Sequence, residues 1–333
     1  MKLSRRRFLH LAAAAGALPV VSRVVSVQTL AQTSAQTYPT RPITIVVPFG
    51  PGSATDTVAR VIAQPLGSAL KQSIVIEPKP GANGTIAAAQ VARAVPDGHT
   101  LILSTNTPHS AAPSLVKNIS YDPVKDFAPL SRIGSFTQVL VLHPDVPVKS
   151  IPELIAFARA NPGRLSFASG NASGILAGET FKRWAGVDII HVPYRTSVPA
   201  LNDVLGGRVS MMFTDLTTGL PHVKAGALRA LATTRLQRSA LLPDLPSLHE
   251  AGVTGFDMDS WAGMFAPANT PGEIIARLNS ELRRIIDDQN VKTPLAAVGF
   301  EAFSSTPEEF GDFVKLQLMK WTRMIKDAGI EAE

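Results

Sequence analysis

Cysteine is missing from this chain of 333 residues. Its absence excludes disulfide bonds, thiolate nucleophiles, iron–sulfur clusters and zinc sites with Cys ligands. It also suits an oxidising compartment, in which a free thiol is a liability.

A strong excess of charge is also missing from most of the chain. There are 32 basic and 26 acidic residues, which gives a formal net charge of +6. Residues 1–31 carry five of the basic residues and no acid, so the remaining residues carry a net charge of +1. A nearly neutral body gives no reason to expect a nucleic-acid partner or binding to an anionic membrane surface.

The N-terminal segment has an apolar run, but a short one. The sequence SRRRFL at residues 4–9 is typical of a twin-arginine export signal, and the apolar residues 11–18 have the length of a signal-peptide core. A membrane-spanning helix needs about 20 strongly apolar residues. We therefore expect residues 1–31 to be a cleaved signal peptide, with residue 35 as an alternative cleavage site. A retained N-terminal anchor is the other interpretation.

From residue 38 onward, short β-rich runs alternate with helical periodicity, which is typical of α/β proteins. A first set of strands is expected at 43–47, 73–76 and 100–103, with helices at 55–70 and 86–95 between them. A second set has strands expected at 139–142, 165–167, 189–192, 209–213 and 228–232. Its first helix should begin after Ser150, with Pro152 in the first turn and Glu153 as the capping partner.

Three helical segments, near 271–288, 291–298 and 306–328, end the chain without a new strand–helix set. They need a sheet to cover, so we expect them to return to the first one. This predicts a discontinuous first domain (38–135 plus 262–333), a second domain at 139–258, and crossovers near 133–140 and 258–266 that form a hinge. Two α/β domains hinged in this way bind a ligand between the carboxyl ends of their sheets.

Two strand-to-helix loops are candidates for ligand binding. The first, GPGSATD at 50–56, and the second, ASGNASG at 168–174, are both rich in small residues. Small residues let backbone N–H groups approach a ligand, and the helix start adds positive charge from the dipole. Neither loop contains Lys or Arg, so backbone N–H groups are expected to hold an anion. Tight turns with ordinary helix caps are the alternative for both loops.

Catalytic and metal-binding patterns are absent or incomplete. The six histidines after the N-terminal segment lack metal-ligand spacing on a shared helix face. The second loop has Ala172 where a nucleophile elbow needs Ser. Gly50 and Gly52, followed by Glu77, partly imitate a dinucleotide fingerprint, but Thr55 stands at the third glycine position. We expect no catalytic residue, no metal and no cofactor; an exported oxidoreductase that binds a dinucleotide at the Gly50–Gly52 loop is the alternative.

Several longer motifs occur in order along the chain. They are RPITIVVPF (41–49), PGANG (80–84), PDGHTL (96–101), YDPVKDFAP (121–129), HVPY (191–194), PALNDVLGG (199–207) and WAGMFAPA (261–268). With the first glycine-rich loop, they resemble the Bug family, the extracytoplasmic solute-binding receptors of tripartite tricarboxylate transporters. The resemblance covers nearly all of the chain after the expected signal.

The resemblance implies an α/β, two-domain fold like that of periplasmic binding proteins, with the two sheets joined by a two-segment hinge. It implies a monomeric periplasmic protein, not an enzyme, that captures a small organic carboxylate and delivers it to membrane permease subunits. Presentation of the ligand to a sensor kinase is a variant of this role. The positions that it marks as ligand-binding are Phe49, Gly52, Ser53, Thr55, Asp56, Ser169, Gly170, Asn171, Ala172, Ser173, Tyr194 and Asp215.

The chain departs from the family pattern in three places near the ligand. Ser53 replaces a common Gly, residues 195–197 (RTS) stand where the family commonly has a Gly after Tyr-Lys, and Ala172 replaces a Gly in the second loop. These changes leave the role in place and bear on which carboxylate is bound.

Overall fold

The computed structural model describes residues 38–239, 241–258 and 260–332, and residues 41–333 form one compact unit. The signal peptide predicted for residues 1–31 lies outside the described residues. Within the described part of the chain, none of the helices combines the length and the apolar character that crossing a membrane requires.

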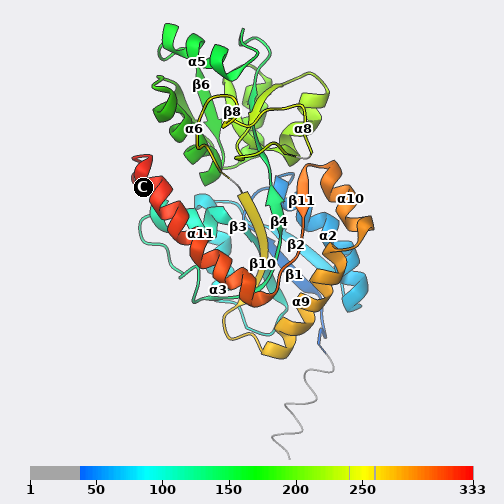
Figure 1. Cartoon of the computed structure of the whole chain (residues 1–333). Coiled ribbons are helices and arrows are strands. Elements are labelled where there is room, and N and C mark those ends of the chain that lie inside the picture. The colour runs from blue at the N-terminus through cyan, green and yellow to red at the C-terminus, as the bar shows by residue number, and fades with distance from the viewer. Residues whose placement is uncertain (1–37, 240, 259, 333) are drawn as a thin grey trace, which may run out of the picture. The chain divides into compact units, whose positions relative to one another are not determined.

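Two mixed sheets organise this unit (Figure 1). The six-stranded sheet has the order β11 (Phe300–Ala302), β4 (Phe127–Phe136), β10 (Ser260–Pro267), β3 (Thr100–Thr105), β1 (Ile43–Val47) and β2 (Ile74–Pro78). Strands β1, β2 and β3 are parallel, whereas β10 is antiparallel to both β3 and β4. The five-stranded sheet has the order β7 (Ile190–Pro193), β6 (Ser166–Ser169), β8 (Met211–Asp215), β5 (Gln138–Leu142) and β9 (Arg229–Thr233).

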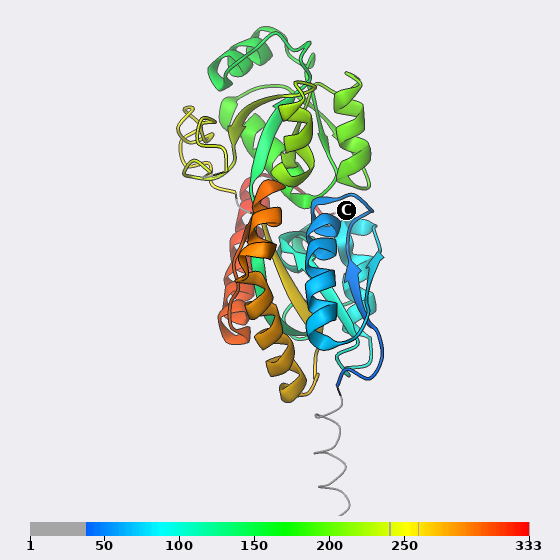
Figure 2. The ribbon, with the colours of Figure 1, turned by 90° about the vertical axis from the view of Figure 1, so that its right-hand side faces the viewer.

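Helices cover the six-stranded sheet. These are α2 (Ala54–Leu70), α3 (Thr85–Ala92), α4 (Ala112–Leu115), α9 (Gly272–Ile286), α10 (Gln289–Ala297) and α11 (Pro307–Asp327). The helices α9 and α11 pack on β4, and α9 and α10 both contact α2. Figure 2 shows this second group, with α9 and α10 in orange beside α2 in blue. A short 3₁₀ turn (Ala82–Gly84) precedes α3, and a π-helical turn (Thr107–Ala111) leads into α4.

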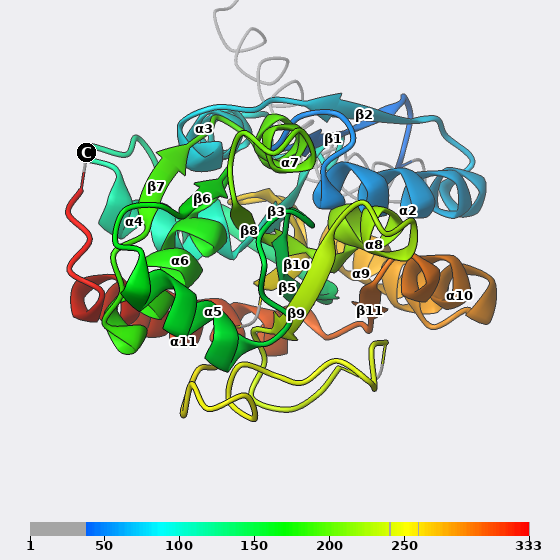
Figure 3. The ribbon, with the colours of Figure 1, turned by 90° about the horizontal axis from the view of Figure 1, so that it is seen from above.

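The five-stranded sheet lies between two pairs of helices, which Figure 3 shows from above. The pair α5 (Ile151–Ala160) and α6 (Ala172–Ala185) covers one face, and the pair α7 (Ser197–Leu205) and α8 (Leu216–Lys224) covers the other. Because successive strand residues point to opposite faces, Met211 and Phe213 join the core under α6, while Met212 joins the core under α7. The predicted cap of α5 is confirmed, since the Ser150 hydroxyl accepts the Glu153 N–H.

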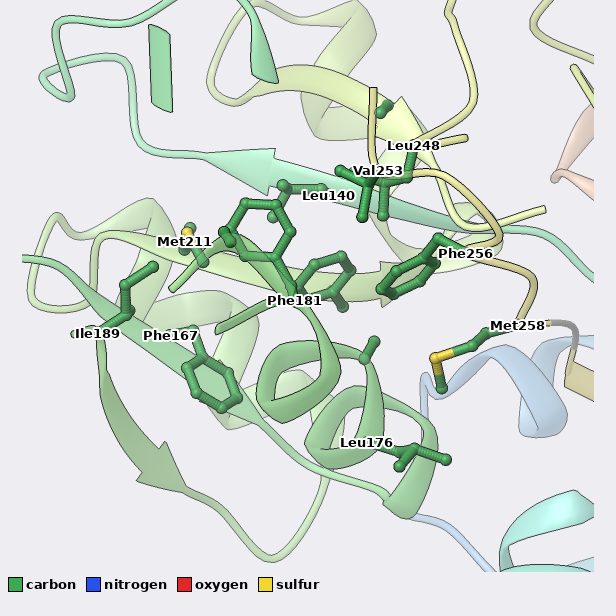
Figure 4. Packing of buried hydrophobic residues seen from close by; sticks show 14 of the residues in the cluster. Leu140, Phe167, Leu176, Phe181, Ile189, Met211, Leu248, Val253, Phe256 and Met258 are labelled. Carbon is green, nitrogen blue, oxygen red and sulfur yellow. The ribbon is translucent and has the colours of Figure 1, made fainter. Parts of the chain in front are cut away.

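The core on the α6 face is large and apolar. Figure 4 shows Leu140, Phe167 and Met211 from neighbouring strands around Phe181 of α6. Leu248, Val253 and Phe256 cover the other side of this cluster; they belong to the segment between β9 and β10. The same cluster includes Trp321 and Ile325 of α11. Helix α11 therefore packs on β4 near its start and on the α6 side near its end.

The chain passes between the sheets twice. It leaves the six-stranded sheet at Thr137, between β4 and β5, and it rejoins that sheet at Ser260, the first residue of β10. Ser260 pairs with Phe136, so the two crossing segments run side by side. The α/β fold class predicted from the sequence, with two sheets joined by two segments, is confirmed.

Candidate functional site

The loop between β1 and α2 is fixed by hydrogen bonds of its own. Ser53 is the N-cap of α2, and its hydroxyl accepts the Asp56 N–H at 3.2 Å. Gly52 has a φ of +77°, which favours glycine, and its N–H donates to the Asp56 carboxylate at 2.9 Å. The Ser53 N–H donates to the carbonyl of Gly50 at 3.1 Å. Thus the N–H groups of Gly52 and Ser53 are used within the loop.

The next two N–H groups remain available. Ala54 and Thr55 are the first residues of α2, where helical geometry provides no acceptor. Among the described residues, neither N–H donates a hydrogen bond to the protein. Both residues line a cavity. The start of α2 therefore presents two donors and the positive end of its dipole to that cavity.

The loop between β6 and α6 has a similar design. Asn171 is the N-cap of α6; its side-chain oxygen accepts the Gly174 N–H at 2.8 Å, and its amide nitrogen donates to the Ser197 hydroxyl at 3.3 Å. Gly170 packs directly on the start of α7, because a Cβ there would lie 2.2 Å from the backbone nitrogen of Ser197. The N–H groups of Ala172 and Ser173 have no hydrogen-bond acceptor in the described part of the chain.

These loops meet at a small cavity between the two sheets, of about 10 Å³, which is room for little more than one water molecule. Most of its lining side chains are polar and uncharged, three are apolar, and one is a carboxyl group. The lining residues are Phe49, Ser53, Ala54, Thr55, Thr105, Thr107, Phe136, Asn171, Ser197, Asp215 and Ser260. They include no Lys, Arg or His.

Asp215 is the charged group of this cavity. It ends β8 and stands at the N-cap position of α8, but its side chain makes no capping hydrogen bond. Burial raises the pKa of Asp215 to about 6, and the amide of Gln138, its partner across β5 and β8, opposes that shift. The Gln138 amide nitrogen does not reach full hydrogen-bond geometry with any acceptor in the described residues. The first N–H of α8, from Leu216, donates to Thr137 at 2.7 Å.

A buried side chain next to the cavity connects the two sheets. Asn106 follows β3 and is completely buried. Its amide nitrogen donates to the Ser173 hydroxyl of α6 at 2.7 Å, and its amide oxygen accepts the Ser260 hydroxyl of β10 at 2.6 Å. One amide therefore joins both sheets and one of the crossing segments.

Five of the residues predicted as ligand-binding line the cavity: Phe49, Ser53, Thr55, Asn171 and Asp215. The other seven are not among the lining residues: Gly52, Asp56, Ser169, Gly170, Ala172, Ser173 and Tyr194.

Each of the outer residues with a polar side chain has a protein partner. The Asp56 carboxylate holds Gly52 and also accepts the Arg60 Nε at 3.0 Å. The Ser169 hydroxyl lies 2.6 Å from the His191 Nε2. The Tyr194 hydroxyl donates to Asp203 at 2.6 Å, and this hydrogen bond raises the pKa of Tyr194.

Sequence reasoning missed six of the lining residues: Ala54, Thr105, Thr107, Phe136, Ser197 and Ser260. Most of them follow strand ends or lie on the crossing segments, where no local motif marks them. Ser197 is different, because Thr196 is the N-cap of α7 and Ser197 its first residue. The Ser/Thr pair before Pro199 is a helix-start signal that would have placed Ser197 at the cavity.

Glu77, the acidic residue of the partial dinucleotide fingerprint, contacts neighbouring protein side chains. Glu77 lies in β2, where it contacts Lys79 at 3.4 Å and Gln90 at 3.5 Å.

His109 is buried, and burial lowers its pKa to about 3. It lies 2.7 Å from the Ser104 hydroxyl and stacks on Phe265. In the described residues, no group of three or more His, Cys, Asp or Glu side chains is placed to hold a metal ion.

Two mixed α/β sheets, two crossing segments and a cavity walled by helix starts define the fold of the periplasmic binding proteins. Residues 58–330 match the family model described as the tripartite tricarboxylate transporter family receptor, TctC. The chain therefore belongs to this family of solute-binding receptors, which are not enzymes.

Solved structures of relatives agree with this assignment. Rpa4515 from R. palustris, solved with adipate, is 35% identical, with a TM-score of 0.87 over 89% of this chain and 100% of that one. The periplasmic binding protein BugD is 35% identical, with a TM-score of 0.85 and the same coverage. MatC from Rhodopseudomonas palustris, solved with malate, is 32% identical, with a TM-score of 0.81 over 86% of this chain and all of MatC.

Proposed function

We propose that this protein is a periplasmic receptor that captures a small organic carboxylate between its two sheets and delivers it to the permease subunits of a tripartite tricarboxylate transporter. The observation that carries this proposal is the pair of unused N–H groups of Ala54 and Thr55 at the cavity wall. A helix start of this kind stabilises a carboxylate without any cationic side chain. Relatives solved with adipate and malate support an organic acid as the ligand.

We assign the contacts as follows. The carboxylate lies at the start of α2, against the N–H groups of Ala54 and Thr55, with Phe49 beside it. Asn171, Ser197 and Asp215 contact the ligand from the five-stranded sheet. Gly52, Asp56, Ser169, Gly170, Ala172 and Ser173 hold these loops in position, and Tyr194 acts through its bond to Asp203.

Capture requires that the protein open and close. We assign residues 38–135 and 262–333 to one domain and residues 139–258 to the other, with crossovers at 133–140 and 258–266 as the hinge. The pairing of Phe136 with Ser260 supports this hinge, because both crossing segments then bend at one place. Residues 1–31 would export the protein through the twin-arginine route, and one folded monomer would deliver one ligand.

The test is a thermal-shift screen of the mature protein, unfolded and refolded to remove any ligand carried through purification. Succinate, malate, aspartate, adipate, citrate and benzoate form the panel. A ligand at 100 times its Kd should stabilise the fold by about 2.7 kcal/mol. For a chain of this size, that raises Tm by roughly 4 °C. If no acid in the panel raises Tm, carboxylate capture is refuted.

A further inference from the structure

Asp215 is an unexpected residue for a cavity that attracts an anion. Its side chain is 9% exposed and lines the same space as the start of α2. The unused N–H groups of that helix favour a negative ligand, whereas a buried carboxylate opposes one. A ligand that suits both walls must carry a negative charge at the end that faces α2 and none at the end that faces Asp215.

The surroundings of Asp215 provide no compensating cation. From β5 it faces Gln138, and the remaining cavity wall offers the neutral side chains of Thr105, Asn171, Ser197 and Ser260. The lining residues contain no Lys, Arg or His.

The first turn of α8 leaves Asp215 without a local partner as well. Its side chain makes no capping bond there, and the Thr217 hydroxyl is buried with no hydrogen-bond partner in the described residues. The other carboxylate near the cavity, Asp56, lies behind the wall and is held by Gly52 and Arg60. Asp215 is therefore the carboxyl group that lines this cavity, and the amide of Gln138 is the polar side chain that faces it from β5.

We propose that Asp215 accepts a hydrogen bond from the ligand, so that the cavity selects a dicarboxylate that carries a hydroxyl or ammonium group over the unsubstituted acid. The cavity of about 10 Å³ has room for little more than one water molecule, so the ligand enters only when the two sheets move apart. This inference rests on the proposed function, since it names the class of carboxylate that the same site takes.

The chemical reason is the cost of placing a second negative charge beside a buried carboxylate that has no cation in the cavity wall. A donor on the ligand gives the Asp215 carboxylate a charge-assisted hydrogen bond, and an ammonium group also neutralises its charge. Succinate offers neither, so it brings a second negative charge to a buried carboxylate. The two acids then differ in affinity although their helix-facing carboxylates make the same contacts.

The experiment compares succinate, malate and aspartate, which share a carbon skeleton and differ by one substituent, in titration calorimetry at pH 7.5. We expect malate or aspartate to bind the wild-type protein at least about tenfold more tightly than succinate. Asp215→Asn should remove most of this difference and bind succinate more tightly than the wild type. Asp215→Ser, a smaller neutral replacement able to cap α8, should behave in the same way.

The matched control is Asp145→Asn, which removes a carboxylate whose side chain is 90% exposed and outside the cavity. It should keep the wild-type preference. Equal binding of the three acids by the wild type, a preference retained in Asp215→Asn, or no binding of any of the three would overturn the inference. Adipate or citrate binding in the wider screen would leave the proposed receptor function standing in each of these cases.

Discussion

The first turn of α2 allows one donor to be removed with little effect on the helix. Ala54 is the first helical residue, a position where proline is favoured because the N–H has no helical partner in any case. The preceding residue, Ser53, has φ −67° and ψ 161°, the extended conformation that a following proline requires. Ala54→Pro should therefore fold and should lack only the N–H that faces the cavity.

The expected loss follows from the kind of hydrogen bond that disappears. A hydrogen bond to a charged group contributes about 1.5–3 kcal/mol. Removing it weakens carboxylate binding roughly 10- to 150-fold. The Thr55 N–H remains, so binding is weakened rather than abolished. The unfolding free energy of the ligand-free variant should stay within about 1 kcal/mol of wild type, since the helix loses no internal bond.

Titration calorimetry with the panel acid that gives the largest thermal shift measures this loss. The matched control is Gln289→Pro, at the first position of α10, where the residue is exposed and its N-cap Asp288 is also extended. The control should bind as the wild type does. If folded Ala54→Pro binds within threefold of wild type, the start of α2 does not hold the carboxylate.

Two further predictions concern stability. Gly170→Ala should lower the unfolding free energy by about 1–3 kcal/mol, because its Cβ would lie 2.2 Å from backbone atoms of Thr196 and Ser197. Urea unfolding measures this loss, and Gly272→Ala, whose Cβ meets nothing within 4 Å, is the control. Equal stability of the two variants would contradict the prediction. His109 should make the protein less stable in acid: its folded pKa of about 3 lies below the ordinary 6.5, so the unfolded chain takes up a proton that the native protein refuses. Stability from this group is complete above about pH 6.5 and falls by up to about 1.4 kcal/mol per pH unit below it. His109→Phe should make the unfolding free energy, measured by urea unfolding between pH 4.5 and 7.5, depend less on pH. If the wild type and the variant lose stability in parallel as the pH falls, the prediction is wrong.

The sequence predicted the regular elements whose signals are local. The strands at 43–47, 100–103 and 139–142 and the helices near 55–70 and 306–328 were expected within a few residues of their observed bounds. Continuous β-branched runs and helix caps identify such elements without reference to the rest of the chain.

The missed elements depend on distant partners. Strand β4 contains Pro129 and Gly134, which weaken a strand pattern, and it is held by β10, more than 120 residues later. Helix α8 contains Gly219 and Pro221, both poor helix formers, and it forms because Leu216 and Leu220 pack in the core of the five-stranded sheet. Local propensity does not carry this information.

The candidate site shows the same division between local and distant causes. Ser53 and Asn171 act as N-caps at the two helix starts, and a cap can be read from neighbouring residues. Whether a side chain in such a loop reaches the cavity is decided by whatever packs behind it. Ser173 lies in the expected loop, yet its hydroxyl accepts a hydrogen bond from Asn106, 67 residues earlier, and Asn106 in turn accepts one from Ser260. Because breaking such a bond would leave buried polar atoms unsatisfied, this network fixes the wall of the cavity. Only the folded chain distinguishes the residues that build this wall from those that face the ligand.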